Sequence, residues 1–201
     1  MKLYFSPGAC SLASHIALCE AGFDCSLEKV DLRAKTTADG GDFRAINPKG
    51  YVPALVLDDG ATLTEGVAIL QHLADIKPEA KLAPAGGTLG RARVNEWLTF
   101  ISSEVHKGFG PLWNPKLSDD LKATAKKTLG DRLAFIDAAL AGKAYLTGDA
   151  FTVPDAYLFT VARWAAHFDI DLAAWPNLAA FMDRMRARPA VKRALEEEGI
   201  A

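Results

Sequence analysis

One cysteine lies where the sequence predicts the start of a helix. The segment Ser6–Ser11 follows a short apolar strand, Leu3–Phe5, and precedes an amphipathic run from Leu12 to Ala21. A cysteine in the first turn of a helix faces unpaired backbone N–H groups and the positive end of the helix dipole, which favour its thiolate. The position predicts a low pKa and high reactivity for the Cys10 thiol. The alternative is a buried structural thiol, the usual state of a free cysteine.

Cys10 has no neighbouring cysteine with which to form a redox pair. The motif continues as Cys-Ser-Leu-Ala rather than Cys-x-x-Cys, and the other two cysteines, Cys19 and Cys25, occupy apolar positions that indicate packing. Thiol chemistry at Cys10 therefore requires an external thiol, for which a glutathione-like tripeptide is the candidate. The odd count of three cysteines argues against a disulfide framework and for reduced thiols.

Composition excludes several classes of partner. The chain has 201 residues, is 50% hydrophobic and carries a formal net charge of -2. It shows no basic cluster for nucleic acid, and no apolar run approaches the roughly 20 residues of a membrane span. The sequence begins directly with a strand pattern and no apolar signal segment, so we expect a cytoplasmic location.

The first part of the chain predicts an α+β domain. The helix after Cys10 ends near Gly22, and alternating residues over 25–32 indicate a second strand. A short helical turn at 43–46 is followed by a hairpin with an Asp-Gly turn and by a helix that opens at 64–66. The order βαβαββα is that of a thioredoxin-like domain. We place it at residues 1–79.

The second part predicts only helices. A Pro- and Gly-rich linker at 80–88 leads to an all-helical domain at 89–201. Its first helix carries a polar stripe that includes Thr99, Ser103 and His106, which could form the edge of a cleft. A later segment, 153–168, is apolar nearly all round and is expected to be the buried centre of this domain.

The start of that buried helix carries a capping signature. Thr152 is a predicted cap, Asp155 follows three residues later, and Pro154 lies in the first turn. A buried helix must satisfy its first N–H groups internally, so we expect Asp155 to have a structural role.

Five motifs in this order resemble the cytosolic glutathione S-transferases, most closely the bacterial beta class. They are Ser6–Ser11, Asn47–Leu55, Leu63–Gly66, Ser103–Phe109, and Gly148–Asp149 with Thr152 and Asp155. The resemblance covers the whole chain. It implies a dimeric enzyme that binds glutathione as a co-substrate.

The resemblance also implies a set of site residues. Cys10 and His106 would be catalytic, and glutathione would be bound by Cys10, Lys35, Val52, Pro53, Glu65, Gly66, Thr99, Ser103, Glu104 and His106. Two positions depart from the family pattern: Gly66 stands where many relatives carry serine, and Thr99 where relatives often carry asparagine.

Each group would have its own part in that site. A cis-proline turn at Val52-Pro53 would offer its backbone to the cysteinyl unit, and the helix start at Glu65 would hold the γ-glutamyl group. Lys35 would meet the glycine carboxylate. Ser103 and Glu104 would reach a glutathione, either their own or that of a partner subunit.

Three functions are consistent with this sequence. The first is a homodimeric glutathione S-transferase of detoxification type, which adds glutathione to small hydrophobic electrophiles or reduces them through a Cys10 mixed disulfide. The second is a glutaredoxin-like thiol-disulfide oxidoreductase, and the third is a non-catalytic interaction module with the transferase fold. The electrophile would bind in the cleft between the domains. His15, His72 and His167 show no ligand-like spacing, so no metal is predicted.

Overall fold

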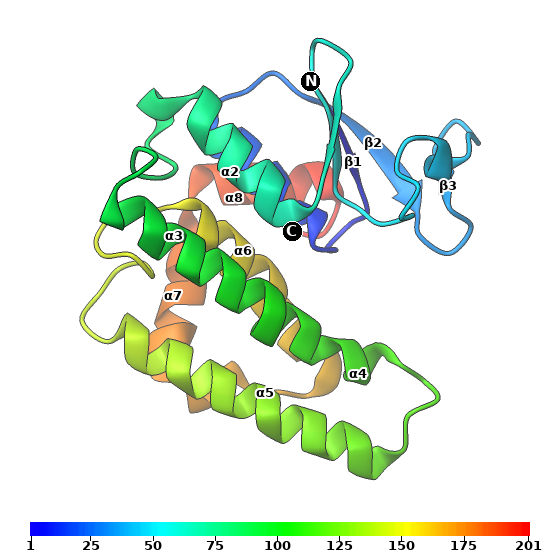
Figure 1. Ribbon diagram of the computed structural model, residues 1–201. Helices are drawn as coiled ribbons and strands as arrows, with labels where there is room; N and C mark the ends of the chain where they lie inside the picture. Colours follow the sequence, from blue (N-terminus) through cyan, green and yellow to red (C-terminus); the bar gives the residue numbers. More distant parts are fainter.

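The computed structural model describes residues 1–201, and Figure 1 shows a sheet with its helices above a bundle of longer helices. The sheet has five strands in the order β3-β2-β1-β4-β5. β1 and β2 are parallel, and the other neighbours are antiparallel. The elements of this part are β1 (Lys2–Phe5), α1 (Ser11–Ala21), β2 (Ser26–Asp31), β3 (Thr36–Thr37), β4 (Ala54–Val56), β5 (Thr62–Thr64) and α2 (Gly66–Ile76).

This sheet with its helices confirms the predicted thioredoxin-like fold, with two local corrections. β3 adds a fifth strand that the predicted order βαβαββα lacks, because Thr36 and Thr37 pair with Asp31 and Val30. A strand of two residues is too short to show the alternation that identifies strands in a sequence. Cys25 was expected on a strand, and it lies just before β2.

The second part contains only helical elements, as predicted. They are α3 (Leu89–Phe100), a π-helical turn (Ile101–His106), a 3-10 turn (Lys107–Phe109), α4 (Gly110–Trp113), α5 (Asp119–Leu140), α6 (Val153–Ala162), a 3-10 segment (Arg163–Phe168), α7 (Pro176–Ala187) and α8 (Pro189–Glu198). α3 runs through the two turns into α4 without a break in the helical path. No helix is both long enough and apolar enough to cross a membrane.

Helix α1 joins the two parts. It contacts α2 in its own part and α6 and α8 in the other. α8, the last helix in the sequence, packs on α1 of the first part. The main apolar core is one continuous cluster of 43 buried residues that draws on β1, α1, α2 and the helical bundle. Helix α1 is therefore held in place by packing from both parts of the chain. The domain boundaries, with a first domain at 1–79, a linker at 80–88 and a second domain from 89, stay a prediction.

Helix α6 is the buried centre of the bundle, and every one of its residues is buried. The predicted capping box is confirmed. The Asp155 carboxylate accepts hydrogen bonds from the Thr152 N–H at 2.8 Å and from the Leu146 N–H at 2.9 Å. Because this helix start is buried, Asp155 supplies the acceptor that these two donors need.

Candidate functional site

Cys10 lies at the start of α1, directly after the turn at Gly8, whose φ is +69°. Its thiol donates a hydrogen bond to the Val52 carbonyl oxygen at 3.1 Å. No side chain caps this end of α1. The sulfur therefore lies between a helix start and the loop before β4.

The predicted low pKa of Cys10 is wrong for this structure. Burial raises the pKa of the Cys10 thiol to about 11, because a thiolate loses its hydration there. The backbone N–H groups of Cys10 and Ser11 lower the pKa, as the helix-start argument predicts, but their effect is smaller. At neutral pH Cys10 is a thiol and a hydrogen-bond donor. The sequence position alone could not reveal that the folded chain half-buries Cys10.

The Val52–Pro53 peptide bond is cis, as the motif predicted. Val52 is buried, and its backbone N–H has no hydrogen-bond partner within the chain. An unpaired buried N–H is costly, so this donor beside the Cys10 sulfur is available to a ligand. Gly66 lies across from Pro53, and a Cβ at Gly66 would rest 3.7 Å from the proline ring in ordinary contact. The space at Gly66 therefore accommodates a Cβ.

Glu65 precedes α2 with φ of +71°, a value that non-glycine residues rarely adopt. No side chain caps α2. The first N–H groups of this helix thus have no intrahelical partners and can receive a carboxylate. The Glu65 carboxylate is exposed and pairs with the Lys49 ammonium at 2.6 Å.

Lys49 is a residue of this site that the sequence reasoning missed. It lies three residues before Val52, and its position inside the Asn47–Leu55 motif was the available signal. Its ammonium also contacts the Thr64 hydroxyl at 3.1 Å. Lys35 approaches from the other side of the loop, where its ammonium donates to the Gly50 carbonyl oxygen at 2.9 Å. Two cations therefore flank the loop that carries the cis-proline turn.

His106 packs against α6 and the segment after it. Its Nδ1 lies 2.7 Å from the Tyr157 hydroxyl, and its ring packs on Trp164 at a centroid distance of 4.9 Å. Trp164 donates its indole N–H to the Gly8 carbonyl oxygen at 2.9 Å. His106 is thus connected, through one aromatic ring, to the turn that carries Cys10.

The charge state of His106 depends on its packing. Burial, with a smaller contribution from the neighbouring Lys107 cation, lowers the pKa of His106 to about 4. Burial also raises the pKa of Tyr157 well above its usual value. At neutral pH the imidazole is uncharged and the phenol is protonated. His106 is then suited to donate or accept a hydrogen bond, and not to act as a cationic acid.

Thr99, Ser103 and Glu104 do not share the surroundings of His106. They line a shallow depression between α3 and α5 together with Arg132, whose guanidinium contacts the Glu104 carboxylate at 2.8 Å. The π-helical turn Ile101–His106 explains the separation. Ser103, Glu104 and His106 all lie within this turn, and its i to i+5 bonding changes the angle between their side chains from that of an α-helix.

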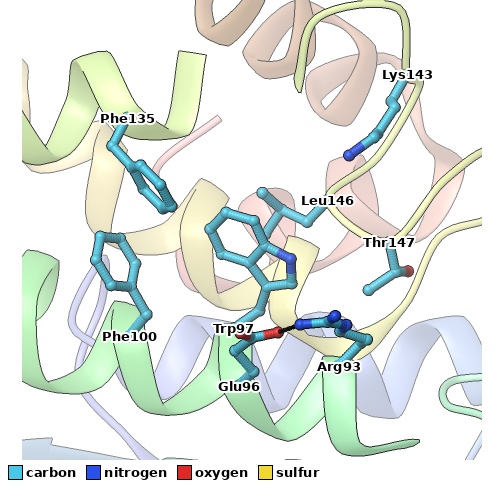
Figure 2. A pocket seen from close by; sticks show the side chains of 8 residues that line it. All are labelled: Arg93, Glu96, Trp97, Phe100, Phe135, Lys143, Leu146 and Thr147. Carbon is cyan, nitrogen blue, oxygen red and sulfur yellow. Dashed lines mark hydrogen bonds and ion pairs between the residues drawn. The ribbon is translucent and has the colours of Figure 1, made fainter. Parts of the chain in front are cut away.

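An apolar groove adjoins that depression. Figure 2 shows Trp97 and Phe100 of α3 facing Phe135 of α5, with the Lys143 ammonium directed toward the groove. The groove has a volume of about 470 Å³. Its opposite wall carries Leu146 and Thr147, and an ion pair between Arg93 and Glu96 at 2.7 Å lies at its rim.

The Gly8 peptide is held on both sides. Its N–H donates to the Glu198 carboxylate at 2.8 Å, while its carbonyl oxygen accepts from Trp164. Glu198 is buried on α8, so the Cys10 turn depends on two elements of the helical part. Neither partner of Gly8 could be identified from the sequence, because both lie more than 150 residues away.

Comparison with known proteins agrees with this geometry. Residues 8–76 match the family described as glutathione S-transferase, N-terminal domain, and residues 100–189 match its C-terminal domain. The chain is 48% identical to glutathione S-transferase GstA of Escherichia coli O157:H7 over 200 residues that cover 100% of both chains.

Two solved structures share the fold throughout. A sphingomonad glutathione S-transferase complexed with glutathione has a TM-score of 0.96 and 50% identity, with 100% of each chain covered. A bacterial beta-class glutathione S-transferase of Sphingomonas chungbukensis has a TM-score of 0.96 and 48% identity, again with 100% of each chain covered. The chain belongs to the glutathione S-transferase family. Its similarity to the beta-class structure confirms the class that its motifs predicted.

Proposed function

We propose that this protein binds glutathione between Cys10, the Val52–Pro53 turn and the start of α2, and transfers it to small hydrophobic electrophiles. One observation carries the proposal: the unpaired Val52 N–H lies beside the Cys10 sulfur and near an uncapped helix start. An extended tripeptide can pair with the Val52 backbone as an added strand. Its γ-glutamyl carboxylate then meets the N–H groups of α2.

Charges around the site match those of the tripeptide. The Glu65 carboxylate would accept the γ-glutamyl ammonium, and Lys35 and Lys49 would attract the glycine carboxylate. Binding exchanges the present Lys49–Glu65 ion pair for contacts with the ligand. Because both partners of that pair are exposed, the exchange costs little.

The protonation states favour transfer over disulfide exchange. When a neutral Cys10 thiol exchanges its hydrogen bond to the Val52 carbonyl oxygen for one to the sulfur of bound glutathione, it stabilises the glutathione thiolate. The thiolate attacks the electrophilic carbon of an aryl halide, the halide leaves with the bonding electron pair, and the proton of glutathione passes to solvent. Disulfide exchange by Cys10 requires its own thiolate, which the raised pKa makes scarce.

His106 would support the same step from the other side. If the Tyr157 hydroxyl donates to Nδ1, the proton of the neutral imidazole lies on Nε2, which becomes a second donor for the developing charge. Trp164 packs on His106, and the exposed Trp113 packs on Trp164. These two rings would form the apolar surface for the electrophile, with the fully buried Phe109 supporting Trp164 from behind.

A second copy of the chain would cover the groove at Trp97, Phe100 and Phe135. An exposed apolar groove rimmed by an ion pair is typical of an interaction surface. The adjoining Ser103 and Glu104 would then face the partner's glutathione site. The three free cysteines fit a reducing compartment, the cytoplasm.

Glutathione binding tests the proposal directly. Glu65→Gln should weaken glutathione binding by about tenfold or more in calorimetry, because it replaces the carboxylate that pairs with the charged ammonium by a neutral amide. Glu79→Gln is the matched control: Glu79 is exposed outside the site, and its change should have no effect. Equal affinity in Glu65→Gln and the parent would refute the site. Failure of the parent to conjugate an aryl halide while it reduces a glutathione mixed disulfide would favour the oxidoreductase.

A further inference from the structure

A cluster of potential metal ligands lies on α1 and α8, apart from the glutathione site. His15 and Cys19 are one turn apart on α1, and Glu197 approaches from α8. One ligand atom of each residue, a ring nitrogen, a thiol sulfur and a carboxylate oxygen, lies within 4.8 Å of the others. These three atom types are the ones that zinc binds in proteins.

Two further contacts orient the ligands in this cluster. His15 Nδ1 lies 3.1 Å from Oε1 of Glu198, whose side chain is fully buried. His15 Nε2 faces Glu197 Oε2 at 2.8 Å, while the other Glu197 oxygen accepts from the Arg193 guanidinium at 2.8 Å. A metal-bound histidine almost always gives its second ring nitrogen to a carboxylate, and bound carboxylates are themselves hydrogen-bonded. Both outer contacts are present here.

We propose that His15 Nε2, Cys19 Sγ and Glu197 Oε2 form a binding site for a divalent zinc-type ion. Zinc bonds of about 2.0 to 2.3 Å in tetrahedral geometry place ligand atoms about 3.3 to 3.8 Å apart. The Glu197 oxygen must therefore retreat from His15 by about 0.5 to 1 Å, and the Cys19 sulfur must approach by up to about 1.5 Å.

The structure permits this adjustment because rigid and adaptable ligands are combined. The His15 side chain is 2% exposed and its ring packs against Phe5, so its position is fixed. The Glu197 side chain is 33% exposed and Cys19 is half-buried, so both can rotate. Their partial exposure also leaves an approach for the ion.

Charge in the cluster suits a dication. A Cys19 thiolate and the Glu197 carboxylate together neutralise the two positive charges of the ion. Burial lowers the pKa of His15, but its hydrogen bonds with Cys19, Glu198 and Glu197 outweigh burial and raise that pKa to about 10. The ion therefore displaces two protons, one from the His15 imidazolium and one from the Cys19 thiol, and both pass to the buffer. Buried Glu198 adds a further negative charge behind His15, and Arg193 opposes it from the surface. The sequence predicted no metal because only the spacing of the histidines was compared. This cluster instead combines His15 with a cysteine and with Glu197, which lies 182 positions after His15.

Cobalt binding tests the site, since Co²⁺ replaces Zn²⁺ in such sites and its bond to a thiolate gives a charge-transfer absorption. The Cys10→Ala protein is the parent, because Cys10 is a second thiol that could bind a soft metal. With Co²⁺ alone and no glutathione present, we expect one equivalent to bind with the sulfur absorption, and Zn²⁺ to displace it. Cys19→Ser should abolish the absorption, and Glu197→Gln should weaken binding by about tenfold or more.

Cys25→Ser is the matched control, since Cys25 is also a half-buried free cysteine. It should leave the absorption and the affinity unchanged. The proposal is overturned if the parent binds no Co²⁺ at micromolar concentrations, if the absorption persists in Cys19→Ser, or if Cys25→Ser abolishes it. Should Cys19→Ser fail to fold, as judged by circular dichroism, an unchanged Co²⁺ affinity in Glu197→Gln overturns it.

Discussion

Tyr157→Phe isolates the role of one hydrogen bond in the chemistry of His106. The substitution removes only the hydroxyl that lies 2.7 Å from His106 Nδ1. The phenyl ring keeps the edge-to-face contact with the imidazole, whose centroid distance is 5.8 Å. Without the hydroxyl, the neutral imidazole can carry its proton on either nitrogen, and Nε2 is no longer held as a donor.

The expected loss is set by the strength of a neutral hydrogen bond. Such a bond contributes about 0.5 to 1.5 kcal/mol, which corresponds to a decrease of about 2- to 12-fold in kcat. Glutathione binding should change little, because His106 acts on the sulfur as charge develops there. The decrease should be the same at pH 6 and pH 8, since a pKa of about 4 keeps His106 neutral at both.

The assay is aryl halide conjugation at saturating glutathione, carried out as a double-mutant cycle. Tyr157→Phe should lower kcat in the parent and have no further effect in a His106→Ala background. His106→Ala alone should lower kcat more than it weakens glutathione binding. An equal decrease in both backgrounds would show that Tyr157 acts through stability and would refute the reasoning.

Three further predictions concern Cys10, the capping box and the groove. The rate of Cys10 labelling by iodoacetamide, followed by mass spectrometry, should be slow at pH 7 and increase about tenfold per pH unit toward a midpoint near pH 11. A midpoint below pH 8.5 would contradict the burial argument. Asp155→Ala should lower the free energy of unfolding in urea by about 2 to 4 kcal/mol, because two buried N–H groups lose their acceptor; a loss below 1 kcal/mol would contradict it. Phe135→Glu should reduce the mass measured by light scattering from twice 21.6 kDa to that of one chain. Leu121→Glu is the control, because Leu121 is also 55% exposed on α5 but lies outside the groove, and this change should leave the dimer intact. A monomeric parent would contradict the dimer.

Local sequence patterns predicted the elements of the fold because each carries its own signal. Gly22 ends α1 in the left-handed conformation, and Asp155 completes the cap of α6, both within a few residues of the pattern that indicated them. The hairpin of β4 and β5 likewise depends on its own turn. These features are decided by neighbours in the sequence, so the sequence alone identifies them.

The electrostatics of the site could not be predicted in this way. The pKa of Cys10 depends on burial by packing from both parts of the chain, which no local pattern reports. The π-helical turn that contains Ser103 and His106 could not be predicted either, since no local residue pattern distinguishes a π-helical turn from an α-helix. Lys49 and Tyr157 were overlooked because their partners, Glu65 and His106, lie elsewhere in the sequence.

The hydrogen bond from the Gly8 N–H to Glu198 has a consequence for how the protein is made. It joins residues 190 positions apart. A ribosome that adds about 5 to 20 residues per second needs about 10 to 40 s to synthesise the chain between these two residues. During this time the turn before Cys10 lacks its anchor on α8, and the burial that keeps the thiol protonated is incomplete. The nascent chain therefore carries a more accessible sulfur than the finished protein, and oxidants in the cell can reach Cys10 most easily before synthesis reaches α8.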